Sequence, residues 1–305
     1  SGKFIKRMKI NLKRGKNAIN ANFPLFFVLF SFSLRKCYDF TAMKIRYRIS
    51  NDKRCKEINA LIEEKFPYMI REKNPDLIFV PGGDGAILHA IQEFNHYKVP
   101  FFGYGMGNLN FLMNDIDLNK VSDFIDKLQG DKIKLQEIET TKISVFLTRK
   151  GNKKTKKIGQ AVNEVVLGSK LMGYHSFKIS SADGSFNNFE IRGSGISVST
   201  DLGSTGYNFN LGGSILPLGS NLWSIIGIAC NRYLEDILMT DKIVIENTSK
   251  RPGLTIFLDS IRQKNRLNMG DKIILKKGDI VRLAFYNKKR FFEKRVDITS
   301  RYRKG

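Results

Sequence analysis

The sequence is poor in the residues that build metal centres and disulfide frameworks. Its 305 residues include three cysteines, three histidines and one tryptophan. Cys37, Cys55 and Cys230 stand far apart and match no metal-ligand spacing, and an odd number at such distances forms no disulfide framework. The histidines do not cluster with other ligand types. We therefore predict no protein-held metal, and a reducing compartment, the cytoplasm.

Acidic residues are also scarce. The chain has 29 Asp and Glu against 52 Lys and Arg, and its net charge is +23. Such a balance suits either nucleic acid or small polyanions such as nucleotides. Residues 1–42 hold nine basic residues against one acid, whereas the remaining excess is spread along the chain. No nucleic-acid recognition module is present, so we predict no specific nucleic-acid partner.

No apolar run reaches the length of a membrane span. The longest, residues 23–34, has twelve residues, and a bilayer needs about 20. Basic residues precede it, as in a signal peptide, but Arg35-Lys36-Cys37-Tyr38 makes a poor cleavage site. One interpretation is a targeting or membrane-associating segment. We favour the other, in which Met43 is the natural start, residues 1–42 are an upstream extension, and there is no membrane partner.

The composition is that of a globular protein, and the length favours two domains. Residues 43–138 alternate strand and helix patterns, which predicts an α/β domain with a parallel sheet. We expect strands at residues 44–49, 76–80 and 100–104, and helices at residues 53–66, 86–94 and 118–128.

From residue 139 the pattern changes to short β-type runs separated by polar turns, which predicts a β-rich domain over residues 139–285 and a basic segment over 286–305. One long helix is expected, at residues 221–238. Strands are expected at residues 142–148, 161–167, 174–180, 195–200, 242–246, 254–258, 272–275 and 279–285.

The most informative local feature is the turn Gly82-Gly83-Asp84-Gly85, between a buried strand and a helix. Glycines let the main chain approach a ligand, and a helix N-terminus attracts phosphate. A carboxylate there would repel phosphates unless it bound Mg²⁺ or accepted a proton from an attacking hydroxyl. Alone, the turn is equally compatible with a simple helix-capping aspartate.

This turn resembles the signature shared by NAD kinases, diacylglycerol and sphingosine kinases and, more distantly, phosphofructokinases. Further elements follow in the order of the NAD kinase family. They are Gly107-Asn-Leu-Asn-Phe-Leu112, Asn163-Glu164, Arg192-Gly-Ser-Gly195, Ser199-Thr-Asp-Leu-Gly-Ser-Thr-Gly-Tyr-Asn208 and Leu211-Gly-Gly-Ser-Ile-Leu-Pro217. The resemblance covers roughly residues 43–300.

The resemblance implies an active site between an α/β domain and a β-rich domain. It implies phosphoryl transfer from ATP or polyphosphate, with Mg²⁺ or another divalent metal, to the 2′-hydroxyl of NAD, and a homodimer or homotetramer. Asp84 would be the base, and Gly82 and Gly83 would bind phosphate. The NAD-binding residues would be Gly85, Asn163, Glu164, Ser194, Thr205, Gly206, Tyr207 and Asn210.

Four positions depart from the family pattern. Ser194 replaces an aspartate that contacts the substrate amide, and Ala86 replaces a threonine next to the glycine turn. Gly206 and Asn110 replace an alanine and a glycine. Losing a charged hydrogen-bond partner costs about 1.5–3 kcal/mol, which weakens an enzyme without abolishing it. Two alternatives therefore stay open: a lipid kinase of the diacylglycerol type, and a weakened nucleotide-binding or nucleic-acid-binding protein.

Overall fold

The computed structural model describes most of the chain beyond residue 42. The described residues are 43–47, 52–106, 110–117, 120–129, 133–169, 173–238 and 240–287, with 289, 291–293, 297 and 300. The predicted extension over residues 1–42 therefore lies outside the described residues, as do Gly107, Asn108 and Leu109. Among the described residues, no helix combines the length and apolarity needed to span a membrane.

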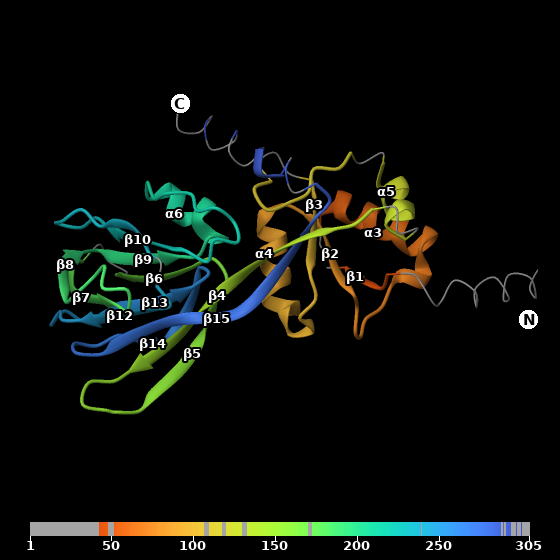
Figure 1. Cartoon of the computed structure of the whole chain (residues 1–305). Helices are drawn as coiled ribbons and strands as arrows, with labels where there is room; N and C mark the ends of the chain where they lie inside the picture. Colours follow the sequence, from red (N-terminus) through yellow and green to blue (C-terminus); the bar gives the residue numbers. More distant parts are fainter. Residues whose placement is uncertain are drawn as a thin grey trace, which may run out of the picture. The chain divides into compact units, whose positions relative to one another are not determined.

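The first half has the strand and helix order expected from the sequence (Figure 1). Strands β1 (Ile45–Tyr47), β2 (Leu77–Gly82) and β3 (Phe101–Gly105) lie side by side and run parallel. Every residue of β2 is buried, as expected of a central parallel strand.

Three helices cover this parallel sheet. Helix α4 (Asp84–Phe94) packs on one face, in a cluster that includes Ile78 and Phe101. Helices α3 (Lys53–Lys65) and α5 (Val121–Gln129) contribute to a separate cluster on the other face. The predicted cap of α3 is confirmed, because the Asp52 carboxylate accepts a hydrogen bond from the Cys55 N–H.

Two long strands continue this sheet into the second half of the chain. Strand β15 (Lys272–Phe285) pairs with β3 in parallel and with β4 (Gln136–Thr148) in antiparallel fashion. The described residues form a nine-stranded sheet in the order β1-β2-β3-β15-β12-β7-β8, and β4 and β5 lie off this path. The added strands are β5 (Thr155–Ala161), β7 (His175–Ser181), β8 (Phe189–Gly193) and β12 (Lys242–Asn247).

A second sheet, with six strands in the described residues, packs against the β-rich part of the first. Its order is β11-β10-β9-β6-β13-β14. Side chains from both sheets, among them Phe177, Trp223 and Ile245, fill one buried cluster. The α/β half and the strand-rich half confirm the predicted fold class. The strands are β6 (Glu164–Ser169), β9 (Gly195–Ser199), β10 (Trp223–Ile228), β11 (Glu235–Leu238), β13 (Leu254–Leu258) and β14 (Ile261–Arg266).

The helix predicted over residues 221–238 is wrong, because this segment forms the hairpin β10–β11. Strand β10 also pairs with β9, so it lies inside the sheet and is buried on both sides from Trp223 to Ile226. A strand buried on both faces shows no alternation and resembles a helix in its apolar pattern. Its β-branched isoleucines and Gly227 were the signals for a strand.

Two strand boundaries also differ from the prediction. The run expected at residues 161–167 is two strands, because the chain breaks at Val162-Asn163 between β5 and β6. The runs at 272–275 and 279–285 are one strand, β15, which continues through a register shift between Lys277 and Ile280. Such a bulge interrupts the hydrophobic alternation without ending the strand.

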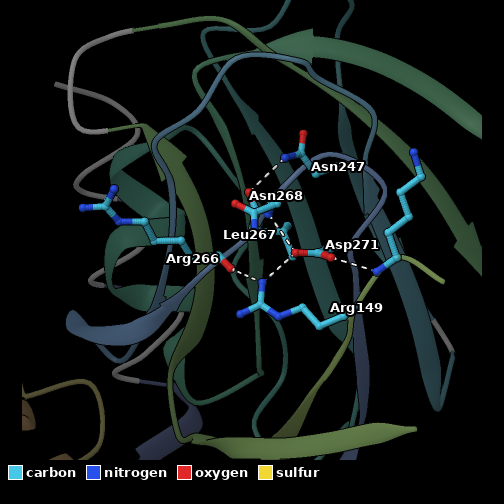
Figure 2. A network of polar contacts seen from close by, with 7 residues as sticks. Arg149, Asn247, Arg266, Leu267, Asn268 and Asp271 are labelled. Atoms are coloured by element: carbon cyan, nitrogen blue, oxygen red, sulfur yellow. Dashed lines mark hydrogen bonds and ion pairs between the residues drawn. The ribbon is translucent and has the colours of Figure 1, made fainter. Parts of the chain in front are cut away.

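A buried carboxylate ties the ends of several strands together (Figure 2). Asp271, next to β15, accepts hydrogen bonds from the N–H groups of Lys150 and Asn268, at 2.9 Å each, and pairs with the Arg149 guanidinium at 2.6 Å. Asn247, at the end of β12, donates to the Leu267 carbonyl at 3.0 Å. This network joins the β4–β5 turn to the connection between β14 and β15.

Candidate active site

The glycine turn leads straight from a strand into a helix, as the sequence predicts. Strand β2 ends at Gly82, Gly83 caps the N-terminus of α4, and Asp84 is the first helical residue. Gly82 has a φ of 145°, and a Cβ there would lie 2.7 Å from the Cβ of Ala86. Only glycine therefore fits at this position.

The N-terminus of α4 is open. No side chain caps it, and a Cβ at Gly83 or Gly85 would meet no atom within 4 Å. The first N–H groups of a helix have no partner within the helix and carry a positive partial charge. The turn therefore offers an accessible seat for a phosphate group.

Asp84 is anchored at this open end. Its Oδ2 accepts a hydrogen bond from the Phe111 N–H at 2.9 Å, and its Oδ1 accepts from the Leu112 N–H at 2.8 Å. The side chain is half-buried. These bonds connect the turn to the described end of the Gly107-to-Leu112 element, a contact that sequence spacing alone did not predict.

The second part of the site is the start of β6, where the chain meets the Gly203 turn. The Asn163 carbonyl accepts hydrogen bonds from Thr200, through both its N–H and its hydroxyl. A Cβ on Gly203 would lie 2.3 Å from the Asn163 carbonyl oxygen, so the two backbones touch. A Cβ on Gly206 would be 4.0 Å from the Glu164 Oε2. The structure thus brings Asn163, Glu164 and the Gly203 turn together.

Asp259 holds the start of β6 in place, a role that the sequence analysis did not predict. Its carboxylate accepts hydrogen bonds from the N–H groups of Val162 at 2.7 Å, Asn163 at 2.6 Å and Glu164 at 3.2 Å. Its Oδ2 also accepts from the Gln92 amide at 2.9 Å. Since Gln92 lies on α4, this carboxylate links the helix of Asp84 to the Asn163–Glu164 pair.

The sequence signal at Asp259 predicted only a polar turn between two β-type runs. Asp259 and Ser260 have φ values of 49° and 67°, which suit a tight hairpin between β13 and β14. Contacts from a hairpin tip to a distant strand start depend on sheet order, and no spacing along the chain encodes them.

Glu164 is a buried acid with an unusual charge state. It is 4% exposed, and its Oε2 has no hydrogen-bond partner among the described residues. Burial, and then the charge of Asp259, raise the pKa of Glu164 to about 7. The side chain is therefore close to half-protonated at neutral pH, and it can donate or accept a hydrogen bond.

The remaining predicted binding residues follow the Gly203 turn. Thr205 ends a short 3₁₀ helix (Gly203–Thr205), and Tyr207 and Asn210 begin and end helix α6 (Tyr207–Asn210). Tyr207 is 41% exposed, and Asn210 is exposed too. The Asn163 Oδ1 is buried without a hydrogen-bond partner among the described residues. These side chains can therefore form hydrogen bonds with a ligand.

Ser194 lies elsewhere. It precedes β9, and its carbonyl accepts from the Ser169 N–H at the far end of β6. Glu164 is at the beginning of β6, five residues before Ser169, and five residues of a strand span about 16 Å. Within one chain the structure does not bring Ser194 to the Asn163–Glu164 pair.

The described residues contain no group of three or more His, Cys, Asp or Glu that could hold a metal ion. Asp84 alone among the predicted site residues supplies a carboxylate beside the phosphate seat.

Comparisons with known proteins agree with one another. The family described as "ATP-NAD kinase N-terminal domain" matches residues 27–133, so the match begins upstream of Met43, where the sequence resemblance was expected to start. NAD kinases of Rickettsia peacockii and Rickettsia prowazekii are each 32% identical to the chain over 203 residues. The aligned parts cover 63% of this chain and 75% of each relative.

Solved structures show the same fold. Yeast NADH kinase complexed with NADH gives a TM-score of 0.67 at 17% identity, covering 84% of this chain and 87% of that chain. An NAD kinase from Archaeoglobus fulgidus in complex with ATP gives 0.58 at 21% identity, covering 83% and 98%.

Proposed function

Because the chain belongs to the NAD kinase family of phosphotransferases, we propose that it transfers the terminal phosphoryl group of ATP to the adenosine 2′-hydroxyl of NAD, giving NADP. The observation that carries the proposal is the pairing of two features. Asp84 stands at a helix N-terminus that no side chain caps, and α4 is bonded through Gln92 and Asp259 to the Asn163–Glu164 pair.

In this proposal Asp84 acts on the attacking hydroxyl. Two backbone N–H groups fix the orientation of its carboxylate, and an ionised carboxylate is a proton acceptor. The 2′-hydroxyl of NAD would lie within hydrogen-bond distance of Asp84, which orients and deprotonates it. The N–H groups of Gly83 and Gly85 would bind phosphate, because negative charge is stabilised at a helix N-terminus.

Asn163 and Glu164 would hold the dinucleotide. The unpaired Asn163 Oδ1 accepts hydrogen bonds, and the Glu164 carboxyl both donates and accepts near neutral pH. Ribose hydroxyls and the adenine edge need such mixed partners. Thr205, Gly206, Tyr207 and Asn210 would complete the pocket wall. Ser194 stays a predicted contact of NAD.

ATP is the proposed donor, and polyphosphate is the alternative. The Archaeoglobus neighbour in complex with ATP supports the first, and the yeast neighbour with NADH supports a dinucleotide acceptor. Mg²⁺ would enter as part of the ATP substrate, where it neutralises phosphate charge. We also propose a homodimer or homotetramer in the cytoplasm. The free thiols of Cys55 and Cys230 agree with a reducing compartment.

The test is NADP formation by the purified chain with NAD, Mg²⁺ and either ATP or polyphosphate. In Asp84→Asn we expect the turnover rate to fall by about 10²–10⁴, the contribution of a positioned proton acceptor. Asp183→Asn is the matched control, because Asp183 lies in the turn after β7, where its carboxylate accepts hydrogen bonds from Ser181 and Ser185.

Three results would contradict the proposal. The first is wild-type turnover in Asp84→Asn. The second is phosphorylation of diacylglycerol or sphingosine in place of NAD. The third is salt-sensitive binding of nucleic acid by a wild-type protein that makes no NADP.

A further inference from the structure

A cavity of about 610 Å³ lies beside the C-terminal half of α4, away from the glycine turn. Gln92, Asn95 and His96 line one side, Lys142 of β4 lines another, and Asp279 and Arg282 of β15 line a third. Helix α4 has eleven residues and is therefore about 16 Å long. The cavity is thus separate from the phosphate seat at the other end of this helix.

The wall formed by β4 and β15 is shaped by a β-bulge. Ile143 pairs with Lys277, and Thr141 pairs with Ile280, so the single residue Lys142 stands opposite two residues, Gly278 and Asp279. A Cβ on Gly278 would make a tight contact of 3.0 Å with the Lys142 carbonyl oxygen. Bulges redirect side chains next to binding sites.

Lys142 is buried with few partners. It is 7% exposed, and its Nζ donates a long hydrogen bond of 3.4 Å to the Ile91 carbonyl. Burial lowers the pKa of Lys142, although the more distant charges of Asp279 and Asp259 oppose this. An ammonium group has three donors, and burying one without partners is costly. Its remaining donors stand at the cavity.

The other cavity residues make the site cationic. Lys98 and Arg282 add two permanent positive charges, and Asp279 is the one carboxylate among the lining residues. Arg282 is partly neutralised by Glu139, at 2.9 Å from its Nε, whereas Lys98 has no such pair among the described residues. Amides from Gln92 and Asn95 add uncharged hydrogen-bonding groups.

We propose that this cavity is a second ligand site, which binds a small phosphate-bearing molecule with Lys142 as its buried cationic contact. The volume lies within the range of small-molecule sites, about 300–1,000 Å³. Lys98 and Lys142 form no ion pair with another described residue, so their positive charges can pair with the negative charge of a phosphate group. Gln92 lines the cavity and also donates to Asp259, so a ligand there would contact the support of the Asn163–Glu164 pair.

Isothermal titration of the full chain with inorganic pyrophosphate tests this site. We expect Lys142→Met to weaken the affinity by roughly tenfold or more, since a charge-assisted hydrogen bond is lost. The matched control is Lys156→Met, which removes the same charge from an exposed position on β5. It should leave the affinity within about twofold.

A second pair of variants does not depend on the buried lysine. Ile280→Glu adds a negative charge at an exposed residue of the cavity wall, 53% accessible, and should weaken binding roughly threefold. Ile261→Glu, at 56%, adds the same charge on β14 and should not. The proposal is overturned if pyrophosphate gives no saturable binding. It is also overturned if Lys142→Met and Ile280→Glu both bind like wild type, because the probe then occupies the glycine turn or another surface.

Discussion

At the scale of single residues, the buried carboxyl of Glu164 stands out because the fold makes its ionisation costly. Burial is the main cause, and the nearby Asp259 carboxylate adds to it. In the unfolded chain the same group has a pKa near 4.5. Between this value and about 7 the folded protein retains a proton that the unfolded chain releases, so folding stability falls as the pH rises.

Glu164→Gln removes this cost. Wild type and variant should have similar stability near pH 4.5, where both side chains are uncharged. Above pH 7 the variant should be more stable by up to about 3 kcal/mol, the free-energy cost of raising the pKa of Glu164 from 4.5 to about 7. Urea unfolding at pH 4.5, 6 and 8 measures this. A stability difference that does not change with pH would contradict the assignment.

Residue identities at the site were partly predictable. The glycine turn around Asp84 carries a local signal for a phosphate site, whereas the nucleotide contact of Asn163 and Glu164 was expected only from the resemblance to the NAD kinase family. The role of Asp259 was not predictable, since it acts through backbone N–H groups almost a hundred residues earlier in the chain. Every residue except proline has a main-chain N–H group, so the identity of the partner residue does not reveal such a hydrogen bond.

At the scale of elements, the β13–β14 hairpin supports the start of β6 through Asp259. In Asp259→Asn one carboxylate oxygen becomes an NH₂ group, which faces N–H donors and cannot accept from them. We expect the KM for NAD to rise about tenfold, with a smaller change in kcat, because the dinucleotide contacts lose their support while Asp84 keeps its own. Steady-state kinetics measures both constants, and an unchanged KM would contradict the proposed role.

Helices and strands of this fold differ in how clearly their sequence pattern indicates their structure. Helices α3 and α4 show the 3.6-residue period and clear start signals, so the sequence located them within two residues. Strand β10 lies between two other strands and under a second sheet, so every position is apolar or small. Such a segment forms a strand because it pairs with strands from distant parts of the chain, and its own hydrophobic periodicity does not indicate this.

At the scale of the whole molecule, the Asp271 network couples loops from both sheets (Figure 2). Burial raises the pKa of Asp271, but hydrogen bonds from Lys150 and Asn268 and the pair with Arg149 outweigh it and leave the pKa below its usual value. Such a group stabilises the fold above its unfolded pKa, and this stability is lost as the pH falls through the folded value.

Asp271→Asn should therefore destabilise the protein by about 2 kcal/mol at pH 7, the value of a charge-assisted hydrogen-bond set. The difference from wild type should shrink as the pH falls below 4. Thermal unfolding across this range measures it, with the exposed Asp241→Asn as control. Equal melting temperatures at pH 7 would show that the network adds nothing to stability.

The long ladder between β4 and β15 has a consequence for how the gene can be divided. The paired positions run from Thr148 and Lys272 to Gln136 and Phe285, through the helix-covered and the strand-rich parts of one sheet. A cut after residue 138, the expected domain boundary, falls inside β4 and leaves β15 on the second fragment. The cut would separate Gln136, Glu137 and Ile138 from their partners on β15, and β3 from β15, while the rest of the ladder would stay within the second fragment. The two fragments should behave as complementing halves that need each other to fold, not as independent modules.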